Sequence, residues 1–355
     1  MSNKRFVIAL ALLALTISVL PVVAQDPLID SVCLITDVGK VNDGTFNQFA
    51  FEGMVAAAED FDLESTFIET TAPTDYESNI QRCIDSEFDA IITVGFLMTD
   101  ASLAAAQANP EIYFMGVDQG FAEAPENLVG IQFREDQSGF LAGALAALMS
   151  ESGTVAGVYG IPIPPVVKFR NGFEQGAKYI NPDITTLGVY IDNFNDPARG
   201  AETALQLIDE GADVIFGAGG PTGSGGIKEA AGQGVMVIGV DQDEYFSTFG
   251  EGETPGAENI ISSAVKRVDQ GVYLSIEALV NGDAAVFYDE DGNRAFSAEN
   301  EGIGFAPAHD AEVPEEVTAQ MDEIYAGLQD GSIETGVDPN SGEMLEPVAT
   351  EEASG

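Results

Sequence analysis

The chain has very few of the side chains on which metal sites and many hydrolases depend. Its 355 residues include one histidine, two cysteines and no tryptophan. A structural zinc site uses four Cys or His ligands, and this chain has only three such residues in total. Only His309 is left for a histidine-based catalytic triad, and it stands beside Asp310 in a polar stretch typical of a protein surface. The sequence therefore predicts no metal ion, no cofactor and no catalytic residue.

Positive charge is also scarce. The 13 lysines and arginines stand against 59 aspartates and glutamates, giving a formal net charge of −46. Nucleic acids and anionic membranes are polyanions, so a field of this sign opposes both as partners. Hydrophobic residues still make up 45% of the chain, which is enough for a sizeable core. We expect a monomer with two lobes, because the chain is too long for a single small domain.

Long hydrophobic runs are missing except at the N-terminus. Lys4 and Arg5 precede an apolar segment, Phe6–Val23, which ends in small residues before Ala24. This layout is typical of a secretory signal peptide over residues 1–24, the alternative being a retained membrane anchor. No cysteine lies near Ala24 to carry a lipid anchor. We therefore expect an exported protein on the outer side of the cytoplasmic membrane.

The two cysteines, Cys33 and Cys83, would lie in that oxidising compartment. They are candidates for a disulfide. The alternative is a pair of buried thiols, because a free cysteine packs as a small apolar residue.

Short apolar strands alternate with helical patterns along most of the chain. Helices of 10 to 15 residues between such strands indicate βαβ units and a parallel sheet, and continuous apolar strands indicate helices on both of its faces. The expected strands are Ser31–Thr36, Thr66–Glu69, Ala90–Gly95, Ile112–Val117, Leu128–Phe133, Val155–Tyr159, Leu187–Ile191, Val214–Gly217 and Val235–Val240.

The predicted lobes each contain two separate stretches of the chain. The N-terminal lobe takes residues 30–150 and about 262–284, and the C-terminal lobe takes 151–261 and about 285–337. A long helical segment is expected over Ala264–Asn281, and a β-hairpin over Phe287–Phe296. Residues 338–355 are acidic and lack aromatic side chains, which predicts a disordered tail.

Each half of the chain contains a similar four-residue segment after an apolar strand. The first runs from Gly116 to Gln119 and the second from Gly239 to Gln242. They place Asp118 and Asp241 at the carboxyl ends of parallel strands, where open α/β sheets bind ligands. Shared strand-end composition is the competing explanation for the match.

The turn after the first strand, Asp37–Gln48, carries the most distinctive chemistry. Asp43 or Thr45 is suited to cap the following helix. Phe46 then lies at the helix start, where its ring would face the crevice and stack on a flat heterocycle, with an amide and a carboxylate nearby. The alternative is a capped turn with Phe46 packed into the core.

A glycine-rich segment, Gly217–Lys228, does not fit a phosphate-binding loop. Ile227 occupies the position where a P-loop has glycine before its lysine, and Thr222 replaces the third glycine of a dinucleotide fingerprint. We interpret it as a flexible loop at the crevice.

The first turn resembles the basic membrane protein (BMP) family, the PnrA-like purine nucleoside-binding proteins of ABC transporters. The resemblance rests on Asp37, Gly39 and the run Asp43–Gln48. It continues in the family's order over further blocks: Val94–Met98, Phe140–Ala147, Pro164–Gly176, Gly217–Ala231, Ile238–Asp241 and Ser262–Asp269. The resemblance implies a two-lobed type I periplasmic-binding-protein fold of the α/β class, with a hinge between the lobes.

The resemblance also implies roles for individual residues. Phe46 and Phe194 would stack on opposite faces of a purine base, with Phe169 or Phe173 as alternatives for the second ring. Asp37 and Asn47 would read the edge of the base.

The remaining implied roles concern the sugar. Asp118, Asp241 and Lys266 would hold the ribose hydroxyls, and Gly217 or Gly219 would let the backbone approach the ligand. The implied function is to capture a purine nucleoside (adenosine, guanosine or inosine) and deliver it to the permease of an importer. The alternatives are a receptor for another small molecule, such as a sugar, and an exported nucleoside hydrolase.

Overall fold

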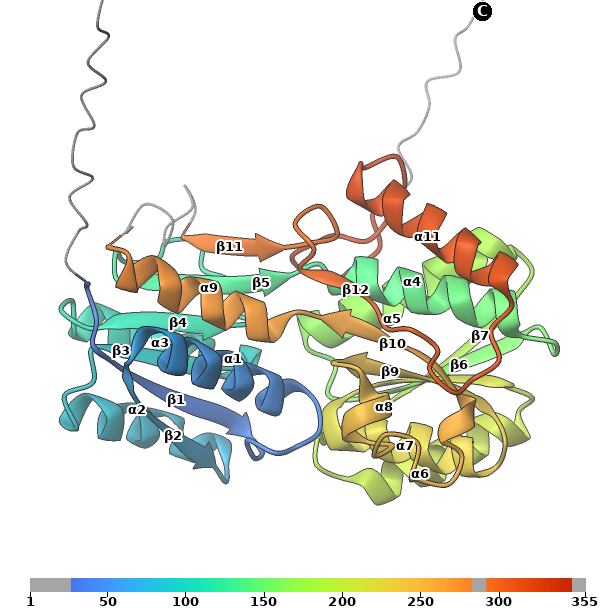
Figure 1. Ribbon diagram of the computed structural model, residues 1–355, viewed down its shortest axis with the longest axis horizontal. Helices are drawn as coiled ribbons and strands as arrows, with labels where there is room; N and C mark the ends of the chain where they lie inside the picture. The colour runs from blue at the N-terminus through green and yellow to red at the C-terminus, as the bar shows by residue number, and fades with distance from the viewer. Residues whose placement is uncertain (1–26, 283–291, 347–355) are drawn as a thin grey trace, which may run out of the picture.

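The computed structural model describes residues 27–282 and 292–346. Its chain forms two lobes that lie side by side, each built on a six-stranded sheet (Figure 1). The expected signal peptide, residues 1–24, lies outside the described residues. Within the described part of the chain, no helix is both long and apolar enough to cross a membrane.

The two sheets have equivalent strand orders and are almost entirely parallel. From edge to edge, the first contains β11 (Asn293–Phe296), β5 (Leu128–Phe133), β4 (Tyr113–Val117), β3 (Ala90–Val94), β1 (Ser31–Val38) and β2 (Glu64–Thr70). The second contains β12 (Ile303–Phe305), β10 (Ile260–Lys266), β9 (Met236–Asp241), β8 (Val214–Ala218), β6 (Thr154–Tyr159) and β7 (Thr185–Tyr190). Among the strands of residues 27–282 and 292–346, only β12 runs antiparallel to its neighbour in the sheet. The predicted two-lobed parallel α/β fold is confirmed.

Helices cover both faces of each sheet. Those of the first lobe are α1 (Phe46–Phe61), α2 (Tyr76–Asp85), α3 (Thr99–Ala108) and α9 (Val268–Val280). Those of the second are α4 (Glu135–Met149), α5 (Pro164–Ile180), α6 (Pro197–Asp209), α7 (Gly220–Gly232), α8 (Glu244–Ser247) and α11 (Glu315–Gln329). Short 3-10 turns occupy Pro73–Asp75, Phe96–Met98 and Ala257–Asn259.

Strand β1 shows why both faces of the sheet are apolar. Its side chains alternate in direction, because successive residues of a strand point to opposite faces. Val32 and Leu34 belong to the core beneath α1 and α9, whereas Cys33 and Ile35 belong to the core beneath α2 and α3. A continuous buried run is therefore what a strand in the middle of this sheet requires.

Three connections join the lobes. The chain passes from β5 into α4, from β10 into α9 and from β11 towards β12. The second of these is visible in Figure 1, where β10 in one lobe leads into α9 in the other. The connections lie on one side of the molecule, as a hinge requires.

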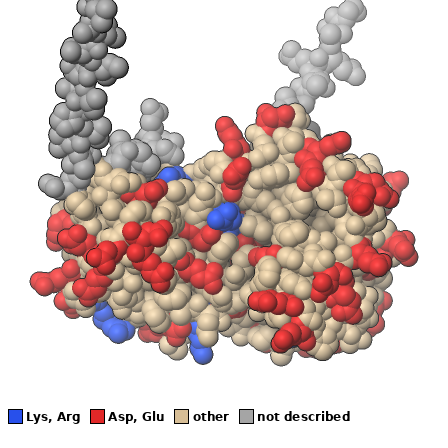
Figure 2. Space-filling model, in the orientation of Figure 1, with Lys and Arg blue, Asp and Glu red and all other residues tan. Residues whose placement is uncertain are grey.

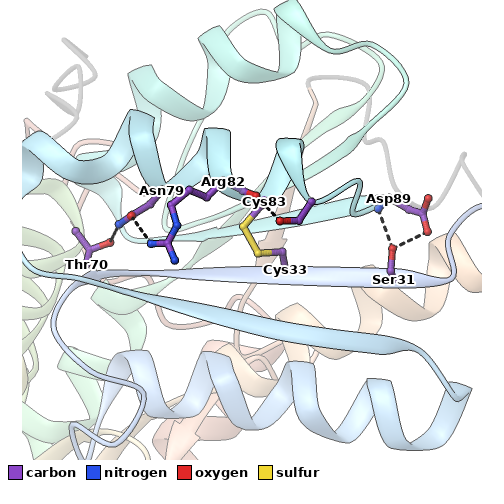
Figure 3. Close-up of a disulfide and its surroundings, with 8 residues drawn as sticks. Ser31, Cys33, Thr70, Asn79, Arg82, Cys83 and Asp89 are labelled. Carbon is purple, nitrogen blue, oxygen red and sulfur yellow. Dashed lines mark hydrogen bonds between the residues drawn. A yellow bond between two sulfur atoms is a disulfide. The ribbon is translucent and has the colours of Figure 1, made fainter.

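Cys33 and Cys83 form a disulfide between β1 and α2, with 6.0 Å between their Cα atoms (Figure 3). Hydrogen bonds flank it on both sides. Ser31 Oγ donates to Asp89 Oδ2 over 2.8 Å, and Asn79 Nδ2 donates to Thr70 Oγ1 over 3.1 Å. The alternative of two buried thiols is therefore wrong.

Three expectations at the end of the chain need correction. Residues 293–296, expected in the C-terminal lobe as part of a hairpin, pair in parallel with β5 of the first sheet. The expected hairpin's first arm lies outside the described residues. Residues 264–266, expected to begin a helix, are the end of β10, which pairs with β9 and β12.

The third correction concerns the tail. Residues 338–346 are ordered, because Val337 and Met344 form a β-bridge and Asn171 Nδ2 donates to the carbonyl of Gly342 over 2.7 Å. The remainder of the expected disordered tail, 347–355, lies outside the described residues.

Candidate functional site

A pocket lies between the lobes at the carboxyl ends of the strands. It encloses about 640 Å³ of space free of protein atoms, part of which is open to solvent. Eight of the nine predicted ligand-binding residues line it: Asp37, Phe46, Asn47, Asp118, Phe194, Gly219, Asp241 and Lys266.

Gly217 is the exception. It lies within β8, and a Cβ there would stand 2.7 Å from the carbonyl oxygen of Gly223 and from Ile227 Cγ2. The glycine therefore lets α7 pack closely on the sheet, and it is not among the residues that line the pocket. Gly219 does line the pocket.

The first turn is organised around the carboxylate of Asp43. Its oxygens accept the backbone N–H groups of Thr45, Asn47 and Gln48 over 3.0–3.1 Å. Of the two predicted caps of α1, Asp43 is therefore the one that acts. Asn47 Nδ2 also donates to Asp43 Oδ2, while Asn47 Oδ1 accepts the backbone N–H of Asp37 over 3.1 Å. Asn47 is thus fixed at the pocket wall from both ends of its amide.

Asp37 lies at the end of β1, close to the backbone of Gly95, which follows the neighbouring strand β3. Its Oδ1 accepts hydrogen bonds from the Tyr76 hydroxyl and from the backbone N–H of Val38. Burial raises the pKa of the Asp37 carboxyl, and these two hydrogen bonds oppose that rise. Gly95, at φ +104°, leaves room for it, because a Cβ there would lie 2.6 Å from Asp37 Oδ2.

Aromatic side chains reach the pocket from both lobes. Phe46 is half-buried at the start of α1, where it lines the pocket and also packs against the core. Phe194, half-buried in the loop before α6, comes from the second lobe. Phe169 lines the pocket as well, but Phe173 is fully buried and stacks on Phe216 with 5.3 Å between ring centroids. Phe173 is therefore not a candidate for the second ring.

Asp118 and Asp241 occupy equivalent positions in the two lobes. They follow β4 and end β9, and both have left-handed backbone conformations, with φ of +61° and +65°. This conformation is uncommon for residues other than glycine, and such strain concentrates at functional sites. The repeated segment noticed in the sequence therefore corresponds to a repeated local structure.

Lys266 forms an ion pair with Asp118 and acts electrostatically on Asp241. Its Nζ lies 2.6 Å from Asp118 Oδ2 and 4.9 Å from the centroid of the Phe46 ring. Asp118 Oδ1 is buried and accepts no hydrogen bond from the described protein atoms. Burial is the main cause that raises the pKa of Asp118 to about 6 and that of Asp241 to about 8, although Lys266 lowers both.

The lobes also touch each other directly across the mouth of the pocket. Asn195 Nδ2 donates to the carbonyl of Val38 over 2.6 Å. The side chains of Gln242 and Ser247 both donate to the carbonyl of Gly44, each over 2.7 Å. All three donors belong to the second lobe and both acceptors to the first turn. The lobes are therefore closed.

Sequence reasoning missed several polar residues around the pocket. Tyr76 binds Asp37, and Glu135 contacts both Lys168 and Lys266. No local motif marks these residues, because their burial depends on the packing of distant segments. No group of three or more potential metal ligands occurs among residues 27–282 and 292–346.

Comparison with known proteins agrees with this architecture. The family model described as ABC transporter substrate-binding protein PnrA-like matches residues 31–327. The CD4+ T-cell-stimulating antigen of Listeria monocytogenes is 27% identical over 326 residues, covering 87% of this chain and 88% of that protein. Basic membrane protein B of Borreliella burgdorferi is 34% identical over 245 residues, covering 66% of this chain and 70% of that one.

Solved structures show the same fold. A solute-binding protein of an ABC transporter system from Aeropyrum pernix K1 superposes with a TM-score of 0.74 at 25% identity, covering 86% of this chain and 92% of that chain. The match of the family model extends over most of the described chain and includes both lobes. This chain belongs to the PnrA-like family of ABC transporter substrate-binding proteins.

Proposed function

We propose that this protein captures a purine nucleoside between its lobes and delivers it to the permease of an ABC importer, without a chemical step. Substrate-binding proteins of ABC transporters work outside the cytoplasm, which agrees with the predicted signal peptide. The proposal rests chiefly on one observation. The pocket combines an aromatic ring from each lobe with carboxyl and ammonium groups at the strand ends.

The aromatic end of the pocket suits a nucleobase. Phe46 and Phe194 offer apolar surfaces to a flat heterocycle, and stacking of a base on an aromatic ring contributes about 1–3 kcal/mol. Asp37 and Asn47 lie beside them and supply acceptors and donors for the edge of the base. A sugar lacks the flat ring that this end of the pocket would accommodate.

The charged end suits the hydroxyls of a ribose. Asp118 Oδ1 is buried without a hydrogen-bond partner among the described protein atoms, which makes it an available acceptor. With a pKa of about 8, Asp241 carries a proton at neutral pH, so it can both donate and accept. A neighbouring pair of hydroxyls needs both kinds of partner.

The charges also favour an uncharged ligand. Besides the protonated Asp241, the pocket is lined by two further acids, Asp37 and Asp118, and by one lysine, Lys266. Figure 2 shows carboxylates spread over the visible face of both lobes, with few basic side chains. A phosphate would meet repulsion from the pocket and from a protein of charge −46. A nucleoside is therefore favoured over a nucleotide.

Calorimetric titration tests the proposal with inosine, guanosine, adenosine, uridine and ribose. We expect the purine nucleosides to bind more tightly than uridine and ribose to bind weakly. Phe46→Ala should weaken nucleoside binding by about 5- to 150-fold through the lost stacking. Binding of ribose with no nucleoside binding would refute the proposal and favour a sugar receptor.

The absence of a chemical step has its own test. The protein is incubated with inosine, and free hypoxanthine is followed by chromatography. We expect no release above the rate without protein. Catalytic turnover would instead identify an exported nucleoside hydrolase.

A further inference from the structure

A network of four buried charges lies beside the pocket. Glu135 has no exposed surface, and its carboxylate contacts two ammonium groups. Lys266 Nζ lies 2.8 Å from Glu135 Oε1, and Lys168 Nζ contacts Glu135 Oε2. Lys168 also donates to the carbonyl of Phe133 over 2.8 Å. Asp118 completes the network through Lys266, so that acids and bases alternate along it.

The network is built on the connections between the lobes. Glu135 begins α4 just after the chain leaves β5, and Lys266 ends β10 just before the chain enters α9. Lys168 comes from α5 of the second lobe. Glu135 and Lys168 do not line the ligand pocket, but line a neighbouring hollow that shares Asp118 with it. They therefore reach the ligand pocket only through Lys266 and Asp118.

Electrostatics makes each member depend on the next. An ion buried without an opposite partner is strongly destabilised, whereas alternating charges compensate one another. Burial by itself raises the pKa of the Glu135 carboxyl, but Lys168 and Lys266 together bring it below its ordinary value. Glu135 therefore remains ionised and attracts the ammonium of Lys266 from the side away from the pocket.

We propose that Glu135 and Lys168 are positioning residues for ligand recognition, which hold Lys266 so that it and Asp118 together face the sugar hydroxyls. This inference rests on the proposed function. Lys266 occupies one oxygen of Asp118 and leaves Oδ1 for the ligand. If the ammonium of Lys266 were displaced, the Asp118 side chain could rotate, and the site would no longer recognise the sugar hydroxyls. The aromatic end of the pocket would be unchanged.

The test compares inosine with 2′,3′-dideoxyinosine, which keeps the base and lacks two ribose hydroxyls. The variants are Glu135→Gln, which keeps the shape of the side chain, and Lys168→Met. Binding is measured by calorimetry, with displacement titrations for the weaker ligand. We expect Glu135→Gln to weaken inosine binding about tenfold or more, as the loss of a hydrogen bond to a charged group does, and dideoxyinosine binding less than about twofold.

Lys168→Met should also weaken the binding of inosine more than that of dideoxyinosine, so that the ratio of the two affinities falls as it does in Glu135→Gln. In the double variant, the fold loss of inosine affinity should be smaller than the product of the two single-variant losses, because both residues act through the ammonium group of Lys266. Glu174→Gln is the matched control, since Glu174 pairs with Arg170 in a partly exposed ion pair on α5. It should leave both affinities unchanged.

A purely structural role predicts a different result. In that case Glu135→Gln would lower the melting temperature and weaken both ligands equally, and this outcome would overturn the inference. Should Glu135→Gln fail to fold, an unchanged ratio of affinities in Lys168→Met would overturn it as well. Failure of the proposed function has a separate signature, because the wild-type protein would then bind neither inosine nor its dideoxy analogue.

Discussion

The contacts between Gln242, Ser247 and the carbonyl of Gly44 predict that affinity depends on residues that do not line the pocket. Each hydrogen bond is worth about 0.5–1.5 kcal/mol net, so Gln242→Ala with Ser247→Ala should destabilise the closed form by about 1–3 kcal/mol. Tenfold in an equilibrium constant is about 1.4 kcal/mol, which makes this roughly 5- to 150-fold. The whole of this free-energy change appears in the apparent Kd when the open form predominates without ligand.

Two measurements on the double variant separate closure from ligand contact. Calorimetry gives the apparent Kd for inosine, and small-angle scattering gives the radius of gyration with and without ligand. If the ligand-free wild type is mainly open, we expect weaker binding with little change in radius; if it is mainly closed, we expect a more expanded ligand-free form. In both cases the radius at saturation should be nearly normal. Gln81→Ala is the control, because Gln81 is exposed and its side chain donates to Asp85 of its own helix. Unchanged affinity together with an unchanged radius would refute the reasoning.

Three further predictions follow from other parts of the structure. Cys33→Ala with Cys83→Ala should lower the free energy of unfolding by about 2–4 kcal/mol in urea titrations, because the disulfide closes a loop with a sequence separation of 50 residues; no loss would contradict this. Asp241→Asn should leave nucleoside binding largely intact, because an amide donates and accepts hydrogen bonds as a protonated carboxyl does, and it should change the pH dependence of stability. The folded-state pKa of Asp241 is raised to about 8, so wild-type stability should fall relative to the variant between pH 5 and pH 8, by up to about 1.4 kcal/mol per pH unit; parallel curves from chemical denaturation would refute it. Gly95→Ala should destabilise the fold by about 1–3 kcal/mol and weaken nucleoside binding, because the residue has a φ of +104° and its new Cβ would collide with Asp37; a neutral result in urea unfolding and calorimetry would contradict it.

Much of the fold was predictable because it depends on local patterns. Buried parallel strands are continuous apolar runs, and the helices between them repeat apolar residues every three or four positions. Strand β11 was expected as one arm of a hairpin, but its partner strand could not be found in this way. Its four residues, Asn293–Phe296, contain no apolar run, and its place in the first sheet is decided by pairing with β5.

The boundary between β10 and α9 was obscured by a different cause. Only Arg267 separates the two elements, and neither glycine nor proline marks a turn at the junction. The tail at 338–346 was misjudged because acidic composition suggests disorder, whereas contacts with α5 hold this segment in place. Both errors arise where tertiary contacts decide the local structure.

The candidate site divides in the same manner. Asp37, Phe46 and Asn47 belong to one short turn, and their spacing marks them together. Gly217 shows the limit of such reasoning, since a glycine needed for helix packing has the same sequence signal as one needed for ligand approach. Glu135 and Lys168 lie far apart in the chain, and only the folded arrangement brings them to Lys266.

The most direct measurement of the central claim is a crystal structure of the protein with inosine. We predict that the purine lies flat against the ring of Phe46 between the two lobes, with the ribose hydroxyls at Asp118 and Asp241. An empty pocket at saturating inosine, or a base that does not contact Phe46, would contradict the account.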